Sequence, residues 1–181
     1  MITCACMATH CGARRRVWLL GLLFACACGS AGEDAPKTLT AADVNNLPAG
    51  DAVGSSFSGI YLIQERSRIT GCHCRAGACD LYKGTLNSFD LTQTNGALHV
   101  LEHGQFNNSD FQGGINSDGT FRVGSMSVAN TLNLLSVLSG TVFARDHFDA
   151  RSQNTLKGQI NGQETDCDLG VEFRANYITE L

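Results

Sequence analysis

Cysteines at two distant places constrain the fold of this chain more than any other feature. Cys72, Cys74 and Cys79 lie close together, and Cys167 follows far downstream. When an antiparallel sheet closes on itself, its first and last strands become neighbours. The residues that follow the first strand then lie beside those that open the last, so we expect Cys167 to pair with Cys72 or Cys74. This arrangement predicts a small all-β domain stapled by sulfur.

Apolar and polar residues alternate from Phe57 onward, which is typical of strands with one buried face. Asn95-Gly96 and Asn161-Gly162 are strong signals for two-residue hairpin turns. The predicted strands span residues 58–68, 87–94, 97–103, 109–115, 120–127, 138–151, 154–161 and 166–177, and residues 128–137, where the alternation breaks, are predicted to form a short helix over one barrel end. The sequence therefore predicts an all-β domain at residues 57–181, a single antiparallel up-and-down barrel of eight strands.

The predicted barrel resembles that of the lipocalins and the related calycins. Gly59-Ile-Tyr61 resembles the glycine-x-aromatic motif on the first strand of that family, with tyrosine where tryptophan is usual. In lipocalins a basic residue near the end of the last strand packs across this aromatic ring. Arg174 is the candidate here, and alternation predicts that it points outward. The resemblance implies a barrel interior that can hold one small apolar ligand.

Side chains on the inward faces are the candidates for ligand contacts. Phe173 and Tyr177 share the apolar face of the last predicted strand. Asp146 shares a face with Val142 and Phe148, and a carboxylate inside a barrel is costly unless it is paired. We therefore predict ligand contacts from Asp146, Tyr61, Glu65, Phe121, Phe173 and Tyr177.

The N-terminal residues 1–27 are predicted to be a cleaved signal peptide. Three arginines at 14–16 precede an apolar run, residues 17–25, that is too short to cross a bilayer. The run ends in Leu23-Phe-Ala-Cys-Ala-Cys28, which resembles the lipobox of bacterial lipoproteins, where one cysteine is acylated and becomes the mature N-terminus. Cys28 is the predicted anchor because it leaves an even set of four cysteines, and Cys26 is the alternative.

The resemblance to lipoproteins also implies a location. Aspartate directly after the anchor cysteine can favour retention in the inner membrane, and Gly29 stands there instead. We therefore expect a protein on the bacterial outer membrane that faces the periplasm or the cell surface. Its acyl chains, palmitate among them, would bind the lipid bilayer. Residues 28–56 hold both prolines and no apolar period, so we expect the anchor and a disordered linker there, with one or two helical turns at 40–47.

The four downstream cysteines can pair in three ways. The preferred prediction is Cys72–Cys167 with Cys74–Cys79. A bridge of this span closes a loop of about 95 residues and contributes ~4–5 kcal/mol on the chain-entropy model. A metal site that includes His73 is the alternative, but the Cys-x-Cys spacing and an oxidising compartment favour disulfides. No metal or cofactor is therefore expected.

Charge and motifs exclude several classes of function. The chain has a net charge of −4 and no basic stripe, which argues against nucleic-acid binding. It has none of the common hydrolase, phosphate-binding or dinucleotide-binding motifs, and His99 and His103 are expected on a solvated face. We predict a non-catalytic envelope lipoprotein whose barrel binds a small apolar ligand. The alternatives are a structural or protein-interaction lipoprotein with a filled barrel, and a small envelope enzyme that uses Asp146.

Overall fold

The structure is a computed structural model that describes residues 36–64, 67–74, 87–104, 108–129, 131–160 and 163–181. The predicted leader, Cys26, Cys28, Glu65 and Cys79 lie outside these residues. The described elements are α1 (Ala41–Asn45), β1 (Gly59–Ile63), β2 (Arg68–Cys74), β3 (Ser88–Thr94), β4 (Ala97–His103), β5 (Asn108–Ile115), β6 (Thr120–Ala129), β7 (Leu132–Phe143), β8 (His147–Ile160) and β9 (Gln163–Thr179). No helix in this part of the chain is long and apolar enough to cross a bilayer.

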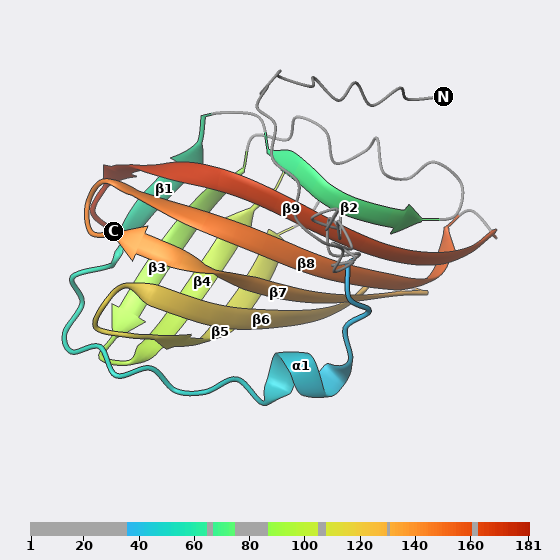
Figure 1. The fold of residues 1–181 in the computed structure, drawn as a ribbon, viewed down its shortest axis with the longest axis horizontal. Coiled ribbons are helices and arrows are strands. Elements are labelled where there is room, and N and C mark those ends of the chain that lie inside the picture. The colour runs from blue at the N-terminus through green and yellow to red at the C-terminus, as the bar shows by residue number, and fades with distance from the viewer. Residues whose placement is uncertain (1–35, 65–66, 75–86, 105–107, 130, 161–162) are drawn as a thin grey trace, which may run out of the picture. The chain divides into compact units, whose positions relative to one another are not determined.

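The strands form one antiparallel sheet that closes on itself (Figure 1). Each strand from β3 to β9 pairs with the next along the chain, and β1 pairs with both β3 and β9. All of β8 pairs with β9, along one edge of β9 from Gln163 to Asn176. β1 and β2 therefore follow each other along the opposite edge, with Ile63 beside Ala175 and Cys74 beside Cys167. The result is an eight-stranded antiparallel barrel with β2 as an additional strand, which confirms the predicted fold class.

Several predicted elements were wrong. The first strand, predicted at 58–68, ends at Ile63, and β2 follows it as a separate strand. The break predicted between residues 151 and 154 lies inside β8. The short helix expected at residues 128–137 is instead the end of β6 and the first half of β7. The strand expected at 138–151 is interrupted at residues 144–146, where the chain turns from β7 into β8. Arg145 adopts a left-handed conformation there, with φ of 57°, in a turn that has no glycine, asparagine or proline to signal it.

The interior of the barrel is apolar and largely aromatic. Its buried members come from every strand of the closed barrel, and they include Tyr61, Phe89, Phe111, Phe121, Phe148, Val100, Val123, Leu138, Val142 and Ala175. These side chains stand at alternate positions along their strands, as the pleat requires. Phe57, Phe173 and Tyr177 are partly buried against the same cluster.

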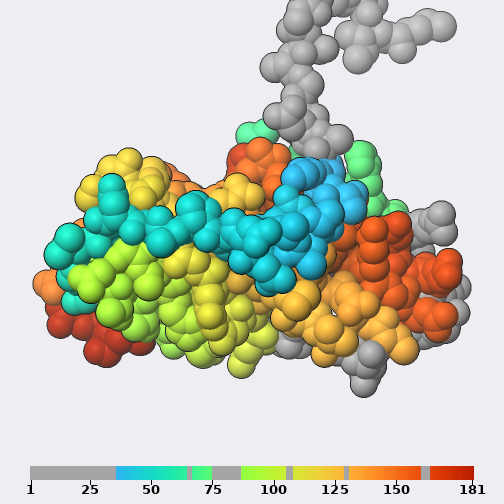
Figure 2. Space-filling model, turned by 90° about the horizontal axis from the view of Figure 1, so that it is seen from below, coloured from blue at the N-terminus to red at the C-terminus, as the bar shows by residue number. Residues whose placement is uncertain are grey.

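A segment before the barrel lies on its outer wall, and we refer to residues 36–52 as the strap. Leu39 and Val44 of the strap are buried against Val137 and Leu135 of β7, on the outward face of that strand. The strap is the blue-to-cyan band that crosses the face seen in Figure 2. The prediction of a disordered linker was therefore wrong for residues 36–52, because apolar strap residues pack on β7.

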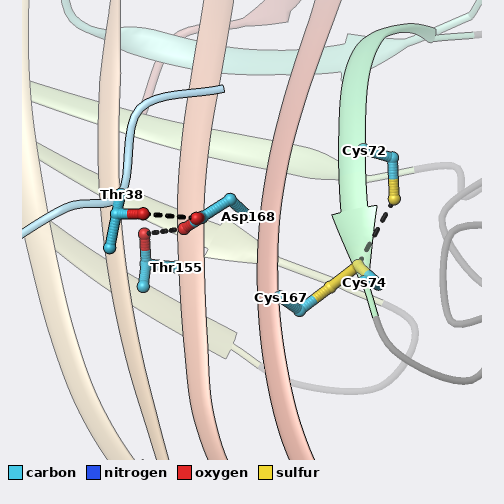
Figure 3. Close-up of a disulfide and its surroundings, with 6 residues drawn as sticks. All are labelled: Thr38, Cys72, Cys74, Thr155, Cys167 and Asp168. Carbon is cyan, nitrogen blue, oxygen red and sulfur yellow. Dashed lines mark hydrogen bonds between the residues drawn. A yellow bond between two sulfur atoms is a disulfide. The ribbon is translucent and has the colours of Figure 1, made fainter. Parts of the chain in front are cut away.

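Hydrogen bonds fix the start of the strap beside the cysteines. The Thr38 hydroxyl donates to Asp168 (2.5 Å), and the Thr155 hydroxyl donates to the other oxygen of the same carboxylate (2.6 Å; Figure 3). The Leu39 amide in turn donates to the Thr155 hydroxyl (2.7 Å). Pro36 packs so closely on Gly71 that a Cβ there would lie 2.6 Å from the proline ring. Every link holds the strap on β8, β9 and β2.

Candidate functional site

The aromatic residues predicted to line a ligand site come together inside the barrel. Phe148 of β8, which was not among the predicted site residues, is fully buried at their centre. Its ring centroid lies 5.2 Å from that of Tyr61, 5.8 Å from Phe173 and 6.0 Å from Phe121. Phe89 stacks on Phe173 at 5.3 Å. At these separations the rings are in contact, so they fill the barrel at this level with side chains.

Tyr61 shows that solvent is excluded from this aromatic cluster. Its side chain is fully buried, and Tyr177 meets it edge to face with the ring centroids 5.5 Å apart. Burial, reinforced by the neighbouring Tyr177, raises the pKa of Tyr61 to about 12. The Tyr61 hydroxyl therefore stays protonated in the physiological range, and its polar contacts are the Phe57 carbonyl at 3.5 Å and the backbone of Arg145. This side chain packs the barrel interior.

The prediction that Asp146 points into the barrel was wrong. Asp146 lies in the turn between β7 and β8 with 76% of its side chain exposed, and it accepts a contact from His147 Nδ1 at 2.9 Å. The turn interrupts the alternation that was assumed to run through residues 138–151. Asp146 thus belongs to the outer surface, and Glu65, the other predicted carboxylate, lies outside the described residues.

Arg174 lies on the outer face of β9, as alternation predicted. Its guanidinium donates two hydrogen bonds to Asp149 of β8, at 2.6 and 2.8 Å. These bonds lower the pKa of the Asp149 carboxyl below its usual value. Because this pair is on the solvent side of the wall, Arg174 does not pack across Tyr61 in the way that the lipocalin resemblance implies.

His99 and His103 also lie on the outer wall, each with its own acidic partner. His99 Nε2 lies 2.7 Å from Asp110, and His103 Nε2 lies 2.8 Å from Asp90. All four side chains are at least a quarter exposed. The two pairs are separate surface contacts across β3, β4 and β5, consistent with the solvated face predicted for these histidines.

The cysteines meet where β2 and β9 run side by side. Cys74 forms a disulfide with Cys167, and 93 residues separate them (Figure 3). The preferred pairing, Cys72 with Cys167 and Cys74 with Cys79, was therefore wrong, because the register of β2 on β9 sets Cys74 opposite Cys167. The Cys72 sulfur lies 3.3 Å from that of Cys74, and Cys72 is itself disulfide-bonded.

Three sulfurs, from Cys72, Cys74 and Cys167, lie within 4.8 Å of one another. Such a cluster could hold a soft metal ion only as thiolates. His73 points to the opposite face of β2 from its two neighbours, as alternation requires, and is exposed. In the oxidised state described here, the cluster is a structural staple between the strands.

A partly buried carboxyl that the sequence interpretation missed lies on the inward face of β4. Glu102 follows Leu98 and Val100 on that face, and it sits between Phe89 of β3 and Ser109 of β5 in the sheet register. Asn87 donates a hydrogen bond to it at 2.5 Å. Burial outweighs the hydrogen bonds from Asn87 and Ser109 and raises the pKa of Glu102. The alternation of residues 98, 100 and 102 could have revealed it.

Replacement of this carboxyl should change how stability depends on pH. Because the folded state raises the pKa of Glu102, stability decreases as pH rises from about 4.5 through the folded-state value. Glu102→Gln should therefore be more stable than the wild type at pH 8, on the order of 1 kcal/mol, with a smaller difference at pH 4. Urea unfolding at both pH values measures this. Glu164→Gln, at an exposed site, is the control, and equal effects of both substitutions would contradict the expectation.

The described residues thus define a small antiparallel β-barrel with an aromatic interior, a strapped outer wall and a disulfide at the β2–β9 seam. Neither a protein-family model, nor a curated protein, nor a solved structure matches the chain. Its likeness to lipocalins is therefore one of architecture.

Proposed function

We propose that this chain is a non-catalytic, lipid-anchored envelope protein whose filled barrel is a rigid scaffold for contacts with other envelope components. The packing around Phe148 carries the proposal. The four aromatic residues predicted to hold a ligand, Tyr61, Phe121, Phe173 and Tyr177, instead contact one another or Phe148. Carriage of an apolar ligand needs space at the level these rings occupy.

The support for the proposed lipid anchor comes from the sequence. The arginines at 14–16, the apolar run 17–25 and the lipobox-like residues 23–28 support export and acylation at Cys28, with Cys26 as the alternative. Gly29 supports delivery to the outer membrane. The Cys74–Cys167 disulfide agrees with an oxidising compartment.

Intact-mass analysis of the protein expressed in a Gram-negative host tests the anchor. We expect a mature chain that begins at Cys28 and carries acyl chains, and we expect Cys28→Ser to lose them. Cys26→Ser is the matched control, because it changes the neighbouring cysteine and should leave acylation in place. If acylation survives Cys28→Ser but is lost in Cys26→Ser, the acylated residue is Cys26. A wild-type protein without acyl chains would contradict the proposal of a lipid anchor.

A second experiment tests the filled barrel. Mass spectrometry of small molecules that co-purify with the unacylated chain from Gly29 onward should find no apolar compound at a stoichiometric level. Reproducible recovery of one such compound would contradict the scaffold proposal and restore ligand carriage.

A further inference from the structure

One stretch of the barrel wall has an open strand edge. Pairing between β5 and β6 begins at Ile115–Phe121 and ends at Gln112–Gly124. Residues 125–129 of β6 therefore pair with β7 on one side and, within the described part of the chain, with no strand on the other. Figure 1 shows why: β3, β4 and β5 run at a steep angle to β6–β9, so β5 diverges from β6 beyond this point.

The side chains along this edge carry no charge. The sequence is Ser125-Met-Ser-Val-Ala129, without proline, lysine or an acidic residue. Met126 and Val128 share the outer face of the strand and are 55% and 69% exposed. Natural edge strands usually carry a charge, a proline or a bulge that prevents pairing with another strand. β2 has a second edge that pairs with no other described strand, and it carries Arg68 and His73.

We propose that a second copy of this chain pairs with residues 125–129 of β6 in antiparallel orientation, about a two-fold axis through Ser127. Pairing about that axis places Met126 opposite Val128 of the second copy, and Ser125 opposite its Ala129. Directly opposed residues lie on the same face of a sheet. Both exposed apolar side chains of each copy then contact those of the other on the outer face, and the Ser127 residues of the two copies meet on the inner face.

Two observations favour a second copy over a different partner. A two-fold contact requires a surface that complements itself, and reversal of this strand opposes Met126 with Val128, Ser127 with Ser127 and Ser125 with Ala129, all uncharged and small or apolar. The chain is acidic overall, so two copies repel each other across most surfaces. That repulsion is smallest at an uncharged strand edge, where backbone donors and acceptors can form hydrogen bonds between the copies. A contact of about five residues per copy is small, so the dimer should be weak and depend on concentration.

Sedimentation of the full mature chain, over a range of protein concentrations and in detergent if it is acylated, tests the proposal. We expect a reversible monomer–dimer equilibrium for the wild type. Val128→Lys and Met126→Lys should each raise the dissociation constant at least about tenfold, because lysine on an edge strand opposes pairing. Val53→Lys is the matched control, since Val53 is 84% exposed in a different segment and should leave the equilibrium unchanged.

Hydrogen exchange locates the contact independently. The amides of residues 125–129 should become more protected as concentration rises, and the amides of β2 should not. A wild type that stays monomeric at several hundred micromolar would overturn the proposal. So would a dimer that Val128→Lys and Val53→Lys leave equally intact, or protection that appears elsewhere. Circular dichroism checks that each variant is folded. We expect all three to fold, because Met126, Val128 and Val53 are exposed.

Discussion

Replacement of both Cys74 and Cys167 by alanine is expected to lower the free energy of unfolding by about 4–5 kcal/mol. The bridge spans 93 residues, and a loop of this size removes much of the conformational freedom of the unfolded chain. The loss is large compared with the total stability of a domain of this size. Chemical denaturation followed by far-UV circular dichroism measures it, since the single tryptophan lies in the predicted leader.

His73→Ala is the control for this substitution. His73 lies between the two cysteines of β2 and is exposed, so its replacement should change stability by no more than about 0.5 kcal/mol. Fragmentation of the cross-linked peptide from the wild type should locate the bridge at Cys74. A bridge located at Cys72, or a double variant as stable as His73→Ala, would contradict the structure.

The barrel itself could be predicted because its signals are local. Residues 97–100 alternate, and the predicted strand 97–103 forms β4 at those bounds. Asn95-Gly96 turns the chain as expected, with Asn95 at φ of 53°. Closure of the meander predicted that the residues after the first strand would meet the start of the last strand, and Cys74 does pair with Cys167 there.

The errors arose where tertiary contacts remove the local signal. β7 is apolar on both faces, because the strap covers Leu135 and Val137 on the outside. A strand buried on both sides loses the period of two, so residues 128–137 were mistaken for a helix. Nothing in the sequence indicates that a segment near residue 40 will cover that wall.

The candidate site was partly predictable for the same reason. Alternation correctly placed Phe121, Phe173 and Tyr177 on inward faces, since each lies well inside a predicted strand. It failed for Asp146, because an unsignalled turn shifted the parity of the residues around it. It did not show that the rings contact one another, because those contacts join strands that are distant in sequence. Alternation therefore predicts which side chains face the interior, but it does not predict whether those side chains leave space for a ligand.

Phe148→Ala is expected to be the most damaging single substitution in the interior, with a loss of about 3–5 kcal/mol in the free energy of unfolding. Phe148 is fully buried and contacts Tyr61, Phe89, Phe121 and Phe173. Removal of its ring leaves an apolar cavity that the surrounding rings close only in part. An apolar cavity of this kind binds small apolar molecules such as benzene. The folded variant should therefore gain a benzene site that the wild type lacks, measured by thermal stabilisation and by NMR shifts.

Phe143→Ala is the matched control, because it removes an aromatic ring that does not belong to the interior packing. Phe143 is 46% exposed and stacks on His147 outside the barrel, so its removal should cost less than about 1 kcal/mol and create no benzene site. Comparable benzene binding by the wild type would mean that the interior already holds space for a ligand. The same rings would then line a carrier site, and the scaffold proposal would fail, because its argument depends on Phe148 and its neighbours leaving no room.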